Sequence, residues 1–200
     1  MKIGIDIDEV VAEFVKGYLK KYTEKYEKSF DFEKIFSYNL WESLNITKEE
    51  AIKLADEFYD SEHFENIGLV SGAKESITKL SKDNELIFIT SRPIKLKNIT
   101  ENFIKNNFKE LLFRILFSND FFQQGNLSKG EICQQENIDF LIEDNKDYSI
   151  SCAEKGIKVI LFDKPWNRNF EHENVTRVSG WEETLEVLKL NEFKEVKNAK

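Results

Sequence analysis

The chain has 200 residues, a hydrophobic fraction of 40% and a formal net charge of −8. This length suits one α/β domain with a modest insertion, and the apolar content is sufficient for a core. The negative charge argues against a nucleic acid polymer or an anionic membrane surface as partner, but a local positive pocket could still bind a small phosphorylated ligand.

Cysteine usage and the first residues of the chain indicate the compartment. Cys133 and Cys152 have neither the spacing of a metal site nor that of a disulfide framework, so a reducing compartment is expected. The sequence enters an apolar strand without a signal-peptide pattern, and no apolar run is long enough to span a bilayer. We therefore expect a cytoplasmic protein without a membrane partner.

The first predicted strand, residues 2–11, contains two aspartates, Asp6 and Asp8. On a regular strand these side chains would share one face and crowd each other. Such a pair is costly unless a metal ion neutralises it or the pKa of one acid rises. Aspartate is also common in ordinary strand-end turns, but two acids flanking a buried isoleucine favour a reactive site.

A helical, aromatic-rich stretch is predicted to follow this strand. Residues 10–27 have the apolar spacing of a helix, and residues 28–45 show no clean period. Thr47 and Glu50 form a capping box that opens a helix to about residue 59. The whole stretch is too long for a plain crossover between strands. We therefore predict a small helical lid over the strand ends.

From residue 71 onward, helices alternate with short apolar strands. The predicted strands cover residues 85–90, 112–117, 139–142 and 158–162, and the predicted helices cover residues 71–82, 96–107, 129–136, 147–155 and 179–190. Residues 191–200 are mostly charged and are expected to fray. Five strands separated by helices predict a Rossmann-like parallel α/β sheet with helices on both faces.

Polar residues follow several of these strands, at the edge where open α/β sheets bind their ligands. They are Asp6 and Asp8, Thr90 to Arg92, Glu143 and Asp144, and Asp163 and Lys164. Three acids from two strands suit a hard cation, and Mg²⁺ is the usual choice beside a phosphate. Hydroxyls and a lysine, Lys129, would bind anionic oxygens. Together these groups describe phosphoryl transfer through an aspartyl-phosphate.

Each of these features also has an ordinary structural explanation. Residues 90–93 could simply connect a strand to a helix, and a lysine such as Lys129 after an N-cap serine is usually solvated. Glu143 and Asp144 could cap the next helix electrostatically. Arg92 could either bind substrate or form a surface ion pair. The joint occurrence of these features in one order favours the functional explanation.

The motifs Asp6-x-Asp8-x-Val10, Thr90-Ser91, Lys129 and Glu143-Asp144 resemble the four ordered motifs of the haloacid dehalogenase superfamily. The resemblance covers about residues 1–165. It implies a five-stranded sheet in the order 3-2-1-4-5 and a helical cap inserted after strand 1. The corresponding domains are a catalytic core at 1–13 and 69–190 and a cap at 14–68.

Within that superfamily the chain resembles the 5′(3′)-deoxyribonucleotidase-like group. The resemblance lies in residues 6–14, 64–73, 90–93 and 162–167. Two departures are visible. Glu9 stands where these nucleotidases usually have glycine, and residues 69–71 replace a proline-bearing stretch.

The resemblance implies a role for each motif residue. Asp6 would be the nucleophile and a metal ligand, and Asp8 would protonate the leaving oxygen, then activate water, and bind the metal through its backbone carbonyl. Lys129 would bridge Asp6 and the phosphate. Thr90 and Ser91 would bind the phosphoryl oxygens, and Asp144 would be the second side-chain ligand of the metal. Glu143 would contact the metal through water or lie in its outer shell.

Four aromatic residues of the predicted cap, Phe14, Phe36, Trp41 and Phe64, could stack on a nucleobase. A small helical insertion also needs a core of its own, and for any one ring that explanation is favoured. His63 and His172 have no partner at ligand spacing and are expected at the surface.

The sequence therefore predicts a Mg²⁺-dependent phosphatase for a small phosphate monoester, with a nucleoside monophosphate as the preferred substrate. The alternatives are a phosphatase of another metabolite such as a sugar phosphate, phosphotransfer between metabolites, and a catalytically idle module that binds a phosphorylated ligand or a protein. A homodimer is compatible with the sequence.

Overall fold

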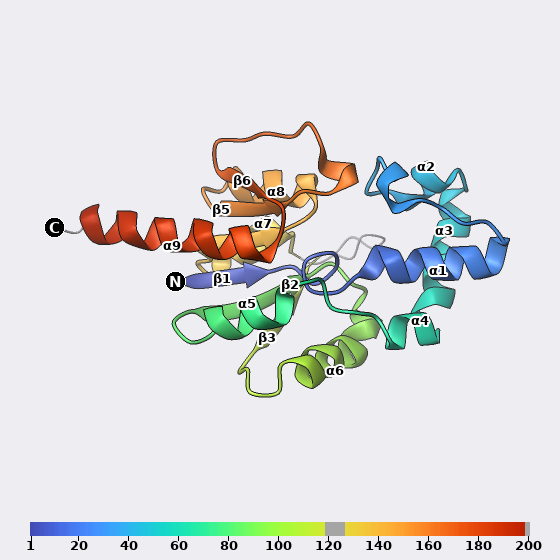
Figure 1. The fold of residues 1–200 in the computed structure, drawn as a ribbon, viewed down its shortest axis with the longest axis horizontal. Helices are drawn as coiled ribbons and strands as arrows, with labels where there is room; N and C mark the ends of the chain where they lie inside the picture. The colour runs from blue at the N-terminus through green and yellow to red at the C-terminus, as the bar shows by residue number, and fades with distance from the viewer. Residues whose placement is uncertain (119–126, 199–200) are drawn as a thin grey trace.

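A single six-stranded parallel sheet forms the centre of the molecule, with strand order β3-β2-β1-β4-β5-β6 (Figure 1). The computed structural model describes residues 1–118 and 127–198, and for 191–198 it describes the helical backbone. The strands are β1 (Lys2–Ile5), β2 (Glu85–Thr90), β3 (Arg114–Phe117), β4 (Phe140–Glu143), β5 (Lys158–Phe162) and β6 (Val175–Val178). The prediction of a parallel α/β sheet is confirmed, and so is the order 3-2-1-4-5 of its first five strands.

The prediction of five strands is wrong, because β6 pairs in parallel with β5 at the edge of the sheet. β6 is only four residues long. Its first three residues are partly buried or exposed, and only its last residue, Val178, is buried. Central parallel strands show continuous apolar runs because both of their faces are covered. An edge strand with exposed positions lacks that signal, so no strand was predicted at this segment.

Strand β1 is central because it pairs with both β2 and β4. Ile5, its last residue, lies opposite Phe88 of β2 and Ile142 of β4. All three side chains are fully buried. The residues that follow β1 are therefore held in the middle of the sheet edge, next to the ends of two other strands.

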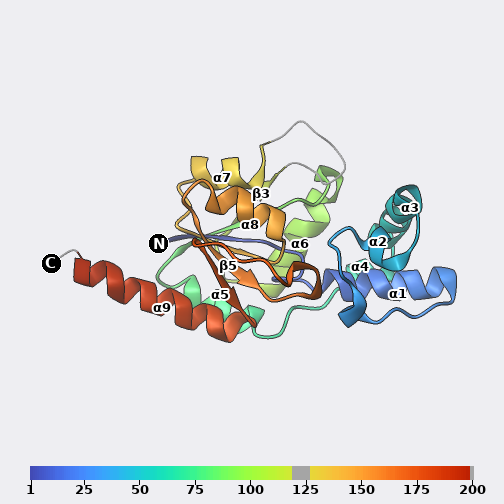
Figure 2. The ribbon, with the colours of Figure 1, turned by 90° about the horizontal axis from the view of Figure 1, so that it is seen from above.

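Helices cover both faces of the sheet, as Figure 2 shows. Helices α5 (Ala73–Leu80), α6 (Lys97–Asn107) and α9 (Trp181–Asn198) contribute to the apolar core on one face. Helices α7 (Lys129–Gln135) and α8 (Lys146–Ala153) contribute to the core on the other face. Cys133 and Cys152 are both buried on these two helices, as expected for small core residues.

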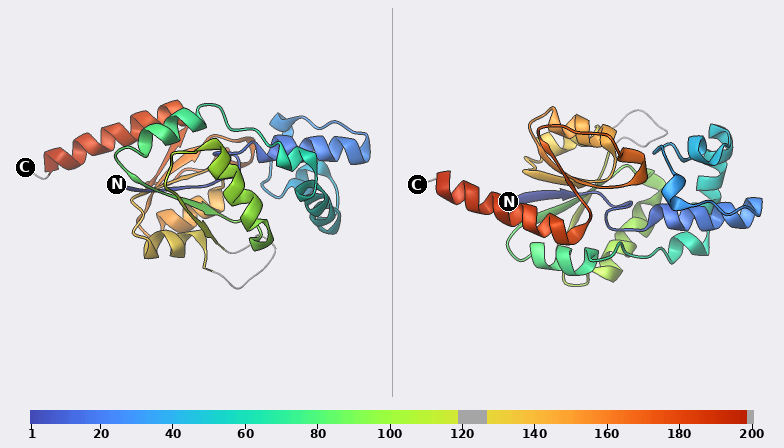
Figure 3. Two further views of the ribbon diagram at one scale, coloured as in Figure 1. Left: turned by 90° about the horizontal axis from the view of Figure 1, so that it is seen from below. Right: turned by 45° about the horizontal axis from the view of Figure 1, so that its top comes forward.

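The helices α1 (Phe14–Tyr26), α2 (Leu40–Leu44), α3 (Lys48–Tyr59) and α4 (Glu62–Glu65) lie between β1 and β2 in the chain, and we call them the helical insert. They pack around a separate apolar cluster in which Leu54 and Phe58 are fully buried. Figures 1 and 3 show the insert beyond the carboxyl ends of the strands, opposite the end of α9. The predicted capping box of Thr47 and Glu50 is present at the start of α3.

Two helix boundaries differ from the prediction by more than two residues. The first helix begins at Phe14 instead of about residue 10, because residues 7–12 form a tight turn instead. Helix α9 continues to Asn198, past the expected end at about residue 190. Residues 199–200 lie outside the described part of the chain, so fraying of 191–200 stays a prediction. No helix in the described ranges is long and apolar enough to cross a bilayer.

Helices α7 and α8 are in close contact at Gly130. A methyl group at Gly130 would lie 2.5 Å from the backbone oxygen and from the Oγ of Ser151 in α8. Real carbon atoms do not come so close to a backbone oxygen, so any larger residue must push the two helices apart. Gly130 directly follows Lys129, so this contact also fixes the helix that carries the lysine.

We expect Gly130→Ala to destabilise the fold by about 1–3 kcal/mol through this overpacking, although alanine favours a helix over glycine by about 1 kcal/mol. Gly180→Ala is the matched control, because a methyl group there meets nothing within 4 Å. Urea unfolding of both variants tests the expectation. Equal midpoints for the two variants would show that the α7–α8 contact is not close packed.

Candidate active site

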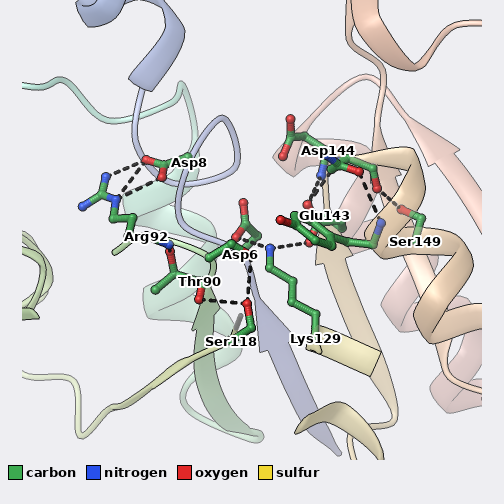
Figure 4. Close-up of polar contacts among 12 residues, drawn as sticks. Asp6, Asp8, Thr90, Arg92, Ser118, Lys129, Glu143, Asp144 and Ser149 are labelled. Atoms are coloured by element: carbon green, nitrogen blue, oxygen red, sulfur yellow. Dashed lines mark hydrogen bonds and ion pairs between the residues drawn. The ribbon is translucent and has the colours of Figure 1, made fainter. Parts of the chain in front are cut away.

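The carboxyl ends of β1, β2 and β4 bring the predicted motif residues together. Asp6 directly follows β1, Thr90 ends β2 and Glu143 ends β4. The backbone N–H of Asp6 donates to the carbonyl of Ile142 at 2.9 Å, which extends the β1–β4 pairing by one residue. Polar side chains that are far apart in the sequence thus meet at one point, as Figure 4 shows.

Lys129 lies at the centre of this cluster, with 1% of its surface exposed. Its Nζ donates to Asp6 Oδ1 at 2.5 Å and to Glu143 Oε2 at 2.7 Å (Figure 4). The Ser128–Glu131 capping box, as predicted, starts α7 at this lysine. Burial alone would lower the pKa of Lys129, but Asp6 and Glu143 raise it well above its usual value. The lysine is therefore a buried ammonium, and the solvated alternative is excluded.

Three buried acids, Asp6, Glu143 and Asp144, have carboxylate oxygens within 4.8 Å of one another. Burial, and next the charge of Glu143, raise the pKa of Asp6 to about 8 although Lys129 opposes this change. Burial also raises the pKa of Asp144 well above its usual value, with contributions from Glu143 and Asp6. Three ionised carboxylates against one ammonium would be an excess of buried negative charge, and the raised pKa values of Asp6 and Asp144 reflect that cost. A divalent cation with a preference for carboxylate oxygens, such as Mg²⁺, fits this donor set.

Asp8 lies within the turn at residues 7–12, which begins directly after Asp6. The carbonyl of Ile7 accepts hydrogen bonds from the N–H groups of both Val11 and Ala12, each at 2.8 Å. Asp8 instead contacts Arg92, whose Nη2 lies 2.6 Å from Asp8 Oδ1 and whose Nε lies 3.0 Å from Oδ2. Each aspartate therefore has its own cationic partner, and the crowding expected on a regular strand does not occur.

Arg92 is buried, so the surface-pair alternative is excluded. Only 4% of the residue is exposed, and its Nη1 donates to Thr100 Oγ1 at 3.2 Å. Its guanidinium carbon also lies 5.1 Å from the centre of the Phe64 ring in the helical insert. Arg92 thus connects Asp8, the α6 helix and the insert. A role for Arg92 in phosphate binding stays a prediction.

The end of β2 forms a small hydroxyl network. Thr90 Oγ1 accepts a hydrogen bond from the N–H of Arg92 at 3.2 Å, and Ser91 Oγ lies 2.8 Å from Ser118 Oγ. Ser118 also donates its N–H to the Thr90 carbonyl at 2.9 Å. Tyr148 of α8 also contacts the site, since the Lys129 ammonium is 4.5 Å from the centre of its ring. Ser118 and Tyr148 were not predicted from the sequence, although Ser118 directly follows β3 and so lies at a strand end; Tyr148 lies within α8 and follows no strand.

Glu9, one of the two departures from the pattern of the nucleotidase group that the sequence resembles, takes a left-handed backbone conformation with φ of 61°. Such a conformation favours glycine and is costly for other residues. The buried Glu9 side chain offsets this cost with two contacts: it accepts from the N–H of Val15 at 2.7 Å and from Lys164 Nζ at 3.0 Å. Glu9 therefore attaches the start of α1 to the loop after β5.

A cavity lies between the strand ends and the helical insert. Its charged and polar lining residues are Asp6, Asp8, Glu9, Ser91, Arg92, Lys129 and Asp144. Its apolar and aromatic lining residues are Phe14, Val15, Tyr18, Tyr38, Leu40, Trp41, Ala51, Ala55, Tyr59, Pro93 and Trp166. The cavity therefore has an ionic end at the sheet and an aromatic end at the insert.

Two of the four predicted cap aromatics, Phe14 and Trp41, line this cavity. Phe36 and Phe64 are not among the described residues that line the cavity. Phe36 is 65% exposed, and the Phe64 ring packs in a T-shaped arrangement against Phe58 with 5.2 Å between ring centres. Sequence reasoning missed the lining residues Tyr18, Tyr38, Tyr59 and Trp166. For Trp166 a signal was present, because it lies in the polar segment after β5. The tyrosines gave no pattern that separates pocket from core.

Comparison with known proteins identifies a family. The sequence profile described as 5′ nucleotidase, deoxy (pyrimidine), cytosolic type C protein matches residues 1–193. A nucleotidase of Clostridium acetobutylicum is 30% identical over 151 residues, which are 76% of this chain and 74% of that protein. A protein of Halalkalibacterium halodurans that is named as a nucleotidase is 30% identical over 183 residues, which are 91% of this chain and 89% of that protein.

A solved structure shares the fold. A haloacid dehalogenase-like hydrolase of Streptococcus pneumoniae superposes with a TM-score of 0.65 at 16% identity, covering 94% of this chain and 97% of that one. With the family match, this confirms the resemblance to the haloacid dehalogenase superfamily and to its nucleotidase group that the motifs indicated.

Proposed function

We propose that this chain, which belongs to the 5′ nucleotidase, deoxy (pyrimidine), cytosolic type C family, releases phosphate from nucleoside monophosphates through a phosphorylated Asp6. Family membership makes the chain a phosphoric monoester hydrolase. The nucleoside monophosphate, the magnesium ion and the covalent intermediate are our proposal.

The observation that carries the proposal is the buried ammonium of Lys129 between Asp6 and Glu143, at the ionic end of an aromatic cavity. A carboxylate nucleophile must approach a dianionic phosphate, so it needs nearby positive charge. Lys129 supplies one such charge from a fixed position. Asp6, Asp144 and the backbone carbonyl of Asp8 would hold Mg²⁺, which when bound supplies further charge to neutralise the phosphoryl oxygens.

The reaction then has two steps. In the first, a carboxylate oxygen of Asp6 attacks phosphorus, the bond to the ester oxygen breaks, and Asp8 gives its proton to the leaving alcohol. In the second, Asp8 takes a proton from a water molecule, the oxygen of that water attacks phosphorus, and the bond to Asp6 breaks. Phosphate leaves and both aspartates return to their starting state.

Other residues near the site bind and orient. Thr90, Ser91 and Lys129 would hold the phosphoryl oxygens, and we assign Arg92 to the orientation of Asp8 because its bonds are made to that residue. The insert would act as a cap that keeps water and large substrates out. Phe14, Trp41 and Tyr59 offer flat rings on the insert side of the cavity, which suits a nucleobase better than a sugar.

A panel of phosphate monoesters tests the proposal. We expect Mg²⁺-dependent phosphate release from nucleoside monophosphates, with lower kcat/KM for sugar phosphates and for an aryl phosphate, and loss of all release in EDTA. Preferred release from sugar phosphates would overturn the proposed substrate and keep the mechanism. No release from any member of the panel would favour an idle binding module.

A further inference from the structure

Trp166 lies against the candidate metal site, although it belongs to none of the four motifs. It lies in the short 3₁₀ helix η3 (Pro165–Asn167) after β5 and is 5% exposed. Its indole Nε1 donates to Asp144 Oδ2 at 2.9 Å. The same ring lines the cavity and packs in a T-shaped arrangement with Phe32, in the short 3₁₀ helix η1 (Phe32–Lys34) between α1 and α2, at 5.6 Å between ring centres.

The segment that carries Trp166 is fixed by its neighbour Asn167, which is fully buried. The Asn167 Nδ2 donates to the carbonyls of Asp144 and Phe162, each at 2.7 Å. Arg177 of β6 in turn donates to Asn167 Oδ1 at 2.6 Å and to the Asn167 carbonyl at 2.9 Å. Both the backbone and the side chain of Asp144 are therefore held by one rigid segment.

The type of donor matters for a metal ligand. An indole N–H is a neutral donor without acceptor capacity, so it can orient a carboxylate without neutralising it. A lysine or arginine in this place would cancel the charge that a cation needs. One carboxylate oxygen of Asp144 lies within 4.8 Å of carboxylate oxygens of Asp6 and Glu143, so a hydrogen bond that fixes the orientation of the Asp144 carboxylate also fixes it relative to these two acids.

We propose that Trp166 is a positioning residue for Asp144, which it orients to bind the magnesium ion. This inference rests on the metal site of the proposed function. Groups that hold a metal ligand in place typically contribute a 10- to 100-fold factor to metal affinity. The edge strand β6 also contributes to this arrangement, because its Arg177 donates hydrogen bonds to Asn167, the neighbour of Trp166.

Isothermal titration of the whole protein with MgCl₂ tests the proposal. Trp166→Phe keeps a flat ring but removes the indole N–H, so we expect the Mg²⁺ dissociation constant to rise by about 10- to 100-fold. Trp181→Phe is the matched control. Trp181 is also buried and its Nε1 donates to the Val10 carbonyl at 2.8 Å, so this variant loses an equivalent hydrogen bond outside the acidic cluster.

Intrinsic fluorescence gives a second readout that does not depend on activity. Mg²⁺ should change the emission of the wild-type protein, because its ligand Asp144 accepts a hydrogen bond from the Trp166 indole. That change should persist in Trp181→Phe and disappear in Trp166→Phe at saturating Mg²⁺.

The outcomes distinguish failure of the proposed metal site from failure of the role assigned to Trp166. If the wild-type protein binds no Mg²⁺, both the metal site and the role of Trp166 are overturned. If it binds Mg²⁺ and Trp166→Phe binds it within twofold as tightly, the metal site stands and the role of Trp166 is wrong. Equal weakening in both tryptophan variants would also overturn that role, since it would reflect a general loss of stability.

Discussion

Asp6→Asn should lower the rate of phosphate release by a factor on the order of 10⁴ to 10⁶, the range seen when a covalent nucleophile is removed. An amide nitrogen or oxygen cannot form the acyl phosphate, and the neutral side chain also loses the ion pair with Lys129. The measurement is steady-state phosphate release with saturating Mg²⁺.

The fold should survive this change. Asparagine has almost the same volume as aspartate and removes one of three buried acids from an over-charged cluster, so we expect a Tm equal to or above that of the wild type. Asp139→Asn is the control, because Asp139 lies at the opposite end of β4 and binds the N–H of Lys2. Appreciable turnover by Asp6→Asn, with Asp139→Asn unchanged, would exclude the covalent mechanism.

Lys129→Met should destabilise the fold by about 3–5 kcal/mol, the usual cost of breaking a buried ion pair from one side. The ammonium is 1% exposed and contacts both Asp6 and Glu143, so its loss leaves two buried acids without a counter-charge. Phosphate release should fall as well, because the nucleophile would lose its neutralising partner. Urea unfolding in EDTA gives the stability, and Lys105→Met on the exposed surface of α6 should change it by less than about 0.5 kcal/mol.

The stability that Lys129→Met loses should depend on pH. Asp6 has a pKa of about 8 in the folded protein against 3.8 for an ordinary aspartate, so between these values the folded state holds a proton that the unfolded state has released. Stability therefore falls as pH rises through this window. Lys129 lowers the pKa of Asp6, so without it the window extends to higher pH. Below about pH 8 Asp6 holds its proton in both proteins, so the extra cost appears above that pH: Lys129→Met should cost more at pH 10 than at pH 6, and an equal cost at both values would contradict this account.

Burial made much of the fold predictable from sequence. The strands at 85–90 and 158–162 were predicted with their observed ends, because continuous apolar runs mark strands covered on both faces. The edge strand β6 has no such run and was missed. The first helix was predicted too early because apolar Val10 and Val11 continue its pattern, although hydrogen bonds from Val11 and Ala12 to the Ile7 carbonyl close a turn there.

The candidate site was predictable where it consists of strand-end motifs. Asp6, Asp8, Thr90, Lys129, Glu143 and Asp144 are all found at one edge of the sheet. Contacts that depend on tertiary structure were not predictable. Nothing in the spacing of Arg92 and Asp8 indicates their ion pair, and the hydrogen bond from Trp166 to Asp144 forms only because β5 pairs beside β4.

The most direct test of the central claim, that Asp6 carries the phosphoryl group, is titration with beryllium fluoride followed by ¹⁹F NMR. Beryllium trifluoride coordinates a carboxylate oxygen in the tetrahedral geometry of a phosphoryl group. We predict a bound fluorine signal that requires Mg²⁺, is absent in Asp6→Asn, and reaches one equivalent per chain as phosphate release is inhibited. Phosphate release that continues uninhibited, with no Asp6-dependent signal, would contradict the account.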